Sequence, residues 1–233
     1  MTVEAGQTLS HYRLIEKIGP VDSFANFDVA PDGRVAITRR EPFINGNSLW
    51  MFEPARQAAI EIGHFDGQSF SDPTFSPDGA TLAFRRGNEV VIRTLKSNTE
   101  TVARKFLGYP DSWSRDGRYL TAGRPVTGGY DAWVLDLTDP SQDRAVVTGM
   151  LLTDEMRFSP NGKWIAFHAA QKATPEVYVI PFTPGRTSTD RIQITTAGGI
   201  QPRWSHDGTE LFYLDLTGQL MAVPIPGGDA GKP

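Results

Sequence analysis

The stretch Phe75–Phe84 reads FSPDGATLAF, and Phe158–Phe167 repeats it almost letter for letter as FSPNGKWIAF. An Asp-Gly or Asn-Gly pair between apolar runs is typical of a β-hairpin, because these residues tolerate the positive φ angles of a tight turn. The same turn occurs five times, and its glycines are Gly33, Gly79, Gly117, Gly162 and Gly208. Their spacings of 46, 38, 45 and 46 residues fall in the range of propeller blades or of two-helix repeats.

The runs that follow each turn are β-rich, which excludes helical repeats. After Gly79, for example, come TLAF, NEVVIRTL and ETVARKF. Four antiparallel strands per unit make one propeller blade. We therefore expect an all-β fold, a five-bladed β-propeller of four-stranded antiparallel blades in a single domain over residues 1–233. The expected blades lie near residues 23–63, 70–107, 108–149, 153–196 and 199–226.

The fifth unit shows only three strands before the chain ends, which would leave an unpaired sheet edge. The strand-like run HYRLIEKI at residues 11–18 precedes the first blade and lacks a partner of its own. We expect Tyr12–Ile18 to pair with Gln219–Ile225 and to close the last blade. A closed ring would be a monomer, whereas an open edge would pair with another copy and give a dimer.

The repeated turn resembles the W/F-S-P-D-G-x-x-I-A-F signature of the TolB-like propeller family, over about Ser23–Pro226. The segment LSHYRLIEKIG at Leu9–Gly19 also resembles the first strand of bacterial serine/threonine protein kinases, many of which carry such a propeller downstream. After Gly19 the chain reads PVDSF instead of a glycine-rich loop, and it has no strand lysine, H-R-D or D-F-G segment. The resemblances imply a propeller with a kinase-fusion remnant. The missing kinase segments exclude kinase activity.

Composition excludes several other classes. The net charge is −4 and the Lys and Arg residues are scattered, so we expect no nucleic-acid partner. The chain has no cysteine, which excludes disulfides and thiolate metal sites. It has no apolar run long enough to span a membrane and no signal-like N-terminus, so cytoplasmic expression is the expected localisation.

Repeat alignment places polar residues at the mouth of the expected central channel. One position of the first strand of each unit holds Asn26, Asp72, Pro110, Glu155 and Gln201, and Asp111 lies next to the proline. Asn26, Asp72, Glu155 and Gln201 would offer hard oxygen ligands for calcium or another divalent cation. The alternative is that polar side chains simply line a water-filled channel.

The second strands should end on the same face. Their ends carry Arg39, Arg85 and Arg124, which would bind an anionic ligand or would pair with the carboxylates nearby. Asp111 is a further candidate ligand-binding residue, because it could take the place of Pro110 in the ring of polar residues. His168 also lies at such an end and is the candidate general base. Its alternative role is an ordinary hydrogen-bonding residue.

The aromatic residues also recur at fixed repeat positions. Phe75, Trp113, Phe158 and Trp204 share one position, which Val29 occupies in the first unit. Two further sets are Phe84, Phe167 and Tyr213, and Trp50, Trp133 and Tyr178. Repetition of this kind predicts packing between adjacent blades.

Two functions remain. The first is a binding module that presents the polar channel site to a small ligand, a cation, or a partner protein or peptide. The second is a divalent-metal-dependent hydrolase of lactones, esters or phosphotriesters, in which the metal would polarise the substrate and His168 or an acid would activate water.

Overall fold

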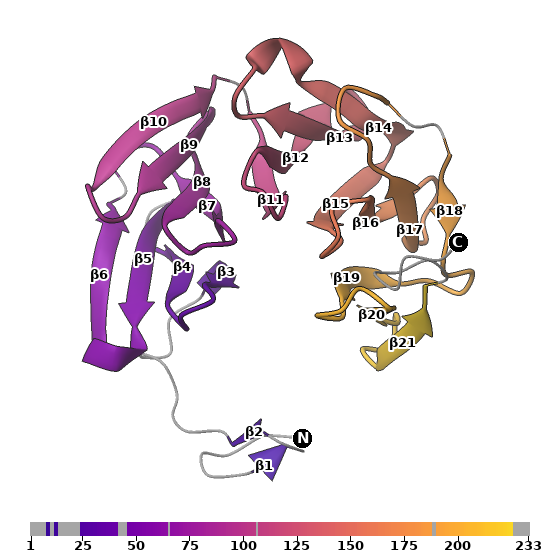
Figure 1. Cartoon of the computed structure of the whole chain (residues 1–233), viewed down its shortest axis with the longest axis horizontal. Coiled ribbons are helices and arrows are strands. Elements are labelled where there is room, and N and C mark those ends of the chain that lie inside the picture. Colours follow the sequence, from indigo (N-terminus) through magenta and orange to yellow (C-terminus); the bar gives the residue numbers. More distant parts are fainter. Residues whose placement is uncertain are drawn as a thin grey trace.

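A computed structural model describes residues 8–9, 12–13, 24–41, 46–64, 66–105, 107–187 and 190–225. Five antiparallel sheets stand side by side around a common axis, and the first strand of each sheet is the innermost (Figure 1). Five sheets match the five repeat units of the sequence. The prediction of an all-β, propeller-type architecture is therefore confirmed.

The first three blades each have four strands in sequential order. Blade I contains β3 (Phe24–Val29), β4 (Val35–Arg40), β5 (Asn47–Glu53) and β6 (Ala58–Gly63). Blade II contains β7 (Phe70–Phe75), β8 (Thr81–Arg86), β9 (Glu89–Thr94) and β10 (Thr99–Arg104). Blade III contains β11 (Tyr109–Trp113), β12 (Tyr119–Val126), β13 (Gly129–Asp136) and β14 (Arg144–Met150).

The last two blades have shorter outer edges. Blade IV contains β15 (Leu152–Phe158), β16 (Trp164–Ala170), β17 (Glu176–Pro181) and the two-residue β18 (Ile192–Gln193). Blade V contains β19 (Ile200–Trp204), β20 (Glu210–Leu214) and β21 (Leu220–Pro224). Helical structure in the described ranges is confined to two 3₁₀ turns, η1 (Pro54–Arg56) and η2 (Pro140–Gln142), and none of it is long and apolar enough to cross a membrane.

The repeated motif builds the turn between the first two strands of each blade. In blade II, Gly79 has a φ of +66° and its N–H donates to the Ser76 carbonyl oxygen at 2.8 Å. The Asp78 carboxylate accepts from the Ser76 hydroxyl at 2.6 Å and from the Ala80 N–H at 2.9 Å. Each residue type of the motif therefore has a role in the turn. The serine and the Asp or Asn make its hydrogen bonds, and the glycine adopts its positive φ, which explains why the chain repeats them.

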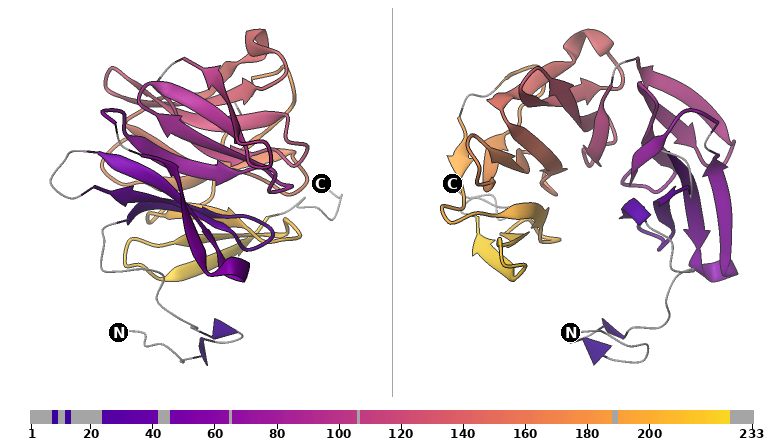
Figure 2. Two further views of the ribbon diagram at one scale, coloured as in Figure 1. Left: turned by 90° about the vertical axis from the view of Figure 1, so that its left-hand side faces the viewer. Right: turned by 180° about the vertical axis from the view of Figure 1, so that it is seen from behind.

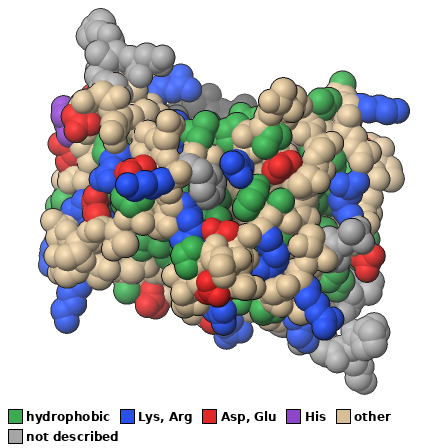
Figure 3. All heavy atoms as spheres, turned by 90° about the horizontal axis from the view of Figure 1, so that it is seen from above, with side chains coloured by type: hydrophobic (Ala, Val, Ile, Leu, Met, Phe, Trp, Pro, Cys, Tyr) green, Lys and Arg blue, Asp and Glu red, His purple; other side chains and the backbone are tan. Residues whose placement is uncertain are grey.

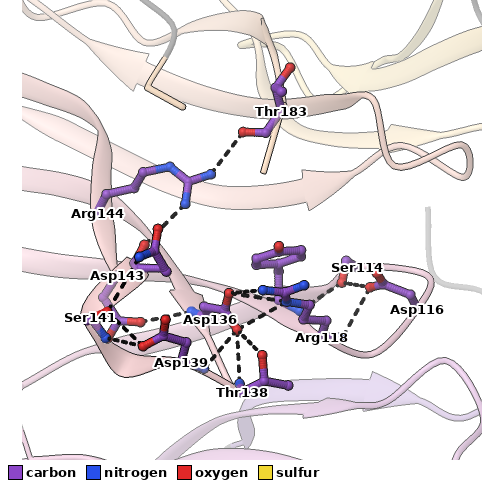
Figure 4. A network of polar contacts seen from close by, with 12 residues as sticks. Ser114, Asp116, Arg118, Asp136, Thr138, Asp139, Ser141, Asp143, Arg144 and Thr183 are labelled. Carbon is purple, nitrogen blue, oxygen red and sulfur yellow. Dashed lines mark hydrogen bonds and ion pairs between the residues drawn. The ribbon is translucent and has the colours of Figure 1, made fainter. Parts of the chain in front are cut away.

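Blade III extends the same turn into a wider polar network (Figure 4). Asp136, at the end of β13, accepts from Arg118 Nη2 at 2.8 Å and from the Thr138 hydroxyl at 2.7 Å. Its side chain is only 1 % exposed, and the Arg118 guanidinium holds the pKa of this carboxyl far below its ordinary value. The ion pair therefore ties the turn to the third strand of the blade.

Hydrophobic clusters join successive blades. Four clusters of buried side chains lie between blades I and II, II and III, III and IV, and IV and V. Phe75, Phe158 and Phe167 are buried in them, and Trp113 and Trp204 pack against them. The prediction that these aromatics pack between blades is confirmed.

Val29 behaves differently, although it occupies the repeat position of Phe75. It is 52 % exposed, and Phe27 on the same strand is 69 % exposed. Among the described residues, no blade packs against this face of blade I. No hydrophobic cluster in the described part of the chain joins blade V to blade I.

The five blades form an open arc, and two opposite views show the same gap between blades V and I (Figures 1 and 2). Among the described residues, β21 pairs only with β20. β1 (Thr8–Leu9) and β2 (Tyr12–Arg13) pair with each other in a separate two-stranded sheet. The predicted pairing of Tyr12–Ile18 with Gln219–Ile225 is therefore not observed for Tyr12 and Arg13, and residues 14–18 lie outside the described residues, as does most of the kinase-like segment.

Charged side chains are dispersed over the surface in Figure 3. On this face Lys and Arg side chains lie among Asp, Glu and hydrophobic side chains, and neither sign gathers into a patch. This pattern agrees with the scattered basic residues of the sequence.

Candidate functional site

The inner strands enclose a polar cavity of about 560 Å³, which we call the channel chamber. Each inner strand has an irregularity in its pairing at the same place, where it bends toward the axis. The residues at these bulges line the chamber, and they are Asn26, Asp72, Asp111, Glu155 and Gln201. The structure thus brings together the four residues that the repeat alignment placed at the channel mouth.

Blade III accounts for the one exception in that alignment. Its irregularity falls between Pro110 and Ser112 and contains one residue, whereas the other blades have two residues at this place. Asp111 therefore takes the bulge position, and Pro110 lines the chamber next to it. The sequence had placed Asp111 among the candidate ligand-binding residues.

Three of the chamber residues adopt left-handed backbone conformations. Asp72, Glu155 and Gln201 have φ angles of +52°, +56° and +55°. A side chain in this region costs about 1–2 kcal/mol relative to an unstrained conformation, and glycine would avoid that cost. The chain instead places two carboxylates and an amide at these positions, with their side chains in the chamber.

The chamber carboxyl groups differ in their protonation. Burial raises the pKa of Asp72 to about 6, and the Asp154 and Glu155 carboxylates add to the effect. Burial also raises the pKa of Asp111 well above its ordinary value, which favours the neutral acid. The Asp111 Oδ2 atom is buried and has no hydrogen-bond partner among the described residues.

Two arginines favour the ionised form of Glu155. Burial raises its pKa, but the Arg203 and Arg157 guanidiniums outweigh burial and hold the pKa below its ordinary value. The Glu155 carboxylate lies 2.6 Å from Arg203 Nη2 and 3.1 Å from Arg157 Nη2. The chamber therefore places Asp111, whose raised pKa favours the neutral form that can donate a hydrogen bond, beside acceptors and cations.

Sequence reasoning missed Arg157 and Arg203. Both line the chamber, and each lies two residues beyond the predicted ring position in its own strand. Because Arg157 and Arg203 occupy the same position in their repeat units, the same repeat alignment could have found them. Asp28 occupies this second position in blade I, where its carboxylate accepts from the Phe75 N–H of blade II at 2.7 Å.

Arg85 lies at an adjoining cavity of about 330 Å³, the tyrosine pocket. Its guanidinium carbon lies 4.9 Å from the centre of the Tyr109 ring, and its Nε donates to the Gly87 carbonyl oxygen at 2.8 Å. Tyr130 also lines this pocket, which shares Asn26, Asp72 and Asp154 with the chamber.

The other three predicted residues do not line either cavity. The guanidinium carbons of Arg39 and Arg124 lie 5.9 Å and 5.0 Å from the ring centres of Trp50 and Trp133, on the third strands. His168 is 6 % exposed, and burial lowers its pKa, so its neutral form is favoured. Its Nδ1 atom is buried without a hydrogen-bond partner among the described residues, and His168 is not among the residues that line the chamber.

The acidic residues do not assemble a metal centre by themselves. In the described ranges, no group of three or more His, Cys, Asp or Glu side chains is arranged to hold a metal ion. The Asn26 and Gln201 amides would have to complete any cation site together with Asp72 and Glu155.

Comparisons with solved structures identify the architecture. A structure described as TolB from Agrobacterium tumefaciens superposes with a TM-score of 0.68 at 18 % identity, over 86 % of this chain and 80 % of that one. TolB from Acinetobacter baumannii gives 0.65 at 20 % identity, over 82 % of this chain and 53 % of that one. A chain from a nidogen–laminin complex gives 0.67 at 11 % identity, over 88 % and 77 %.

These likenesses show the propeller fold, including its TolB-like form, and identities this low show nothing further. No family model matches the sequence. No curated protein matches it either.

Proposed function

We propose that this chain is a propeller binding module whose channel chamber binds a small polar ligand. The observation that carries the proposal is the convergence of one repeat position from five blades on a single cavity. Three of those residues keep polar side chains on left-handed backbone, where glycine would relieve the strain. Strain of this kind is typical of ligand sites, since the surrounding fold must hold it in place.

The chamber chemistry favours a ligand with several hydroxyl or amino groups. Asp72 and Glu155 accept hydrogen bonds, Asp111 is favoured in a form that donates, and the Asn26 and Gln201 amides do both. The unpaired Asp111 Oδ2 atom is a polar group for which a bound ligand would supply the missing partner. The cavity volume of about 560 Å³ lies within the range of small-molecule sites.

A thermal-shift screen tests the proposal. Sugars, amino acids, polyamines, short peptides, Ca²⁺ and Mg²⁺ would be tested against the wild type and the double variant Asp72→Asn/Glu155→Gln. The control is Asp66→Asn/Glu210→Gln, which changes two exposed carboxylates outside the chamber. The proposal expects a compound that stabilises the wild type and the control but not the chamber variant. Equal stabilisation of all three proteins by every active compound would contradict it.

The same screen separates the predicted alternatives. Stabilisation by Ca²⁺ or Mg²⁺ alone would favour the cation site, and ester or phosphotriester hydrolysis that stops with a chelator would favour the metal-dependent hydrolase. His168 lies outside the chamber lining, so in this hydrolase an acidic residue of the chamber would have to activate the water. Stabilisation by peptides alone would favour a protein or peptide partner.

A further inference from the structure

The opposite end of the channel carries a second cavity, at the Asp-Gly and Asn-Gly turns. This cavity of about 460 Å³, which we call the turn-face cleft, is lined by blades II to V. Its charged lining residues are Arg115, Arg157 and Arg203, and none of the described residues that line it is Asp or Glu. We propose that the turn-face cleft binds an anionic group, a carboxylate or a phosphate, carried on a flat apolar body.

The arginines make the cleft positively charged. Glu155 balances one of the charges of Arg157 and Arg203, because a single carboxylate contacts both guanidiniums from the chamber side. Arg115 adds a further charge at the opposite wall. Among the described residues, Arg115 makes one long hydrogen bond, of 3.4 Å from Nη1 to the Pro160 carbonyl oxygen, so its other N–H groups remain able to bind an anion.

Two further carboxylates, which follow cleft residues in the sequence, are engaged in the turns. Asp116 follows Arg115, but its Oδ1 atom accepts from the Ser114 hydroxyl and from the Arg118 N–H at 3.1 Å. Asp207 follows His206 and accepts from the Ser205 hydroxyl at 2.7 Å. Neither carboxylate lines the cleft, so neither cancels the basic lining at the point where a ligand would sit.

The apolar part of the lining is rigid. The Trp113 indole N–H donates to the Thr74 carbonyl oxygen at 3.1 Å, and the Trp204 indole N–H donates to the Arg157 carbonyl oxygen at 3.0 Å. Each bond crosses from one blade to the one before, which fixes the two rings against the channel wall. Fixed rings beside arginines suit a flat ligand body, since little side-chain entropy is lost on binding.

Titration calorimetry with phenyl phosphate, benzoate and phenol tests the inference. Phenyl phosphate or benzoate should bind, neutral phenol should bind at least tenfold more weakly, and added salt should weaken the anion. Arg115→Gln and Arg203→Gln should each weaken anion binding by about tenfold. Arg56→Gln is the matched control, because Arg56 is an exposed arginine outside the cleft, and it should bind as the wild type does.

The Asp72→Asn variant separates this cleft from the chamber, because Asp72 lines only the chamber and the tyrosine pocket. It should leave the affinity for the anion unchanged. Binding of one anion alone would identify whether the cleft takes a carboxylate or a phosphate. Failure of both anions to bind, equal binding of phenol, or wild-type affinity in Arg115→Gln would each overturn the inference.

Discussion

The Glu155 carboxylate of blade IV lies 2.6 Å from the Arg203 guanidinium of blade V, across the boundary between the two cavities of the channel. Arg203 lines both the chamber and the turn-face cleft, whereas Glu155 lines only the chamber. The pair therefore separates a chamber rich in carboxyl groups from a basic cleft. A ligand on either side would meet a different face of the same ion pair.

Asp72 predicts an unusual pH dependence of stability. Its pKa rises from an ordinary 3.8 to about 6 in the folded protein, so the folded state binds this proton more tightly than the unfolded state. Stability attributable to Asp72 is fully present below the ordinary pKa and is lost as the pH rises through about 6. Asp72→Asn should raise the free energy of unfolding at pH 8 by up to about 3 kcal/mol.

Urea unfolding at pH 8 and pH 4 measures this effect. The gain should fade at pH 4, where the wild-type carboxyl is protonated in the folded state and, with an ordinary pKa of 3.8, is partly protonated in the unfolded state as well. Asparagine also tolerates the left-handed backbone. Asp66→Asn, at an exposed aspartate, is the control and should change little at either pH. A gain of equal size at both pH values would show that the charge of Asp72 is not its cause.

Asp136 predicts a pH dependence of stability with the opposite sign. Because Arg118 holds its folded-state pKa below the ordinary value, its contribution is present above that value and is lost as the pH falls toward the folded-state pKa. Asp136→Asn should lower the free energy of unfolding by about 2 kcal/mol at pH 7, since the bonds to Arg118 and Thr138 lose their charge. Denaturant unfolding at pH 7 checks this, and an unchanged midpoint would contradict it.

Gln201 tests the cost of left-handed backbone. Gln201→Gly should leave stability unchanged or raise it by up to about 1 kcal/mol, because glycine adopts a φ of +55° without strain. Thr101→Gly, in the regular exposed strand β10, should instead lower stability by about 1 kcal/mol. Equal losses in the two variants, measured by thermal unfolding, would show that the backbone at Gln201 carries no relievable strain.

The open arc predicts self-association. Leu220 of blade V is 71 % exposed, and Phe27 of blade I is 69 % exposed on the other side of the gap. Light scattering should therefore detect a dimer at micromolar concentration, and Leu220→Lys should shift it to monomer. Leu151→Lys, at an exposed leucine of blade IV, is the control and should remain dimeric.

A monomeric wild type would contradict that prediction and would favour closure of the ring by the N-terminal segment. Deletion of residues 1–19 should then lower the melting temperature well beyond the effect of a tail truncation, since a closing strand would be lost. An unchanged melting temperature would exclude closure by this segment as well.

Much of the fold could be predicted from the turn motif. The glycines at 33, 79, 117, 162 and 208 fix one hairpin in each unit, and period-2 alternation sets the strands that follow. Closure of the ring could not be predicted in this way, because a strand-like pattern such as HYRLIEKI does not specify the strand with which it pairs. Pairing of Tyr12 and Arg13 with β1 depends on a local hairpin that carries no strong turn signal.

The candidate site was only partly predictable for a related reason. Equivalent positions meet at the axis by symmetry, so Asn26, Asp72, Glu155 and Gln201 could be found by alignment. Arg39 and Arg124 share the correct end of the sheet, but their side chains lie over the tryptophans of the third strand. The position of a residue along its strand thus predicts where it lies along the channel axis. The direction of its side chain depends instead on the groups that it contacts.

The most direct measurement is an amide NMR titration with the strongest compound from the thermal-shift screen. The account predicts saturable shifts centred on Asn26, Asp72, Glu155 and Gln201, which are lost in Asp72→Asn/Glu155→Gln and kept in Asp66→Asn/Glu210→Gln. Shifts confined to the outer strands or rim loops, with these four amides unmoved, would contradict the chamber as the binding site.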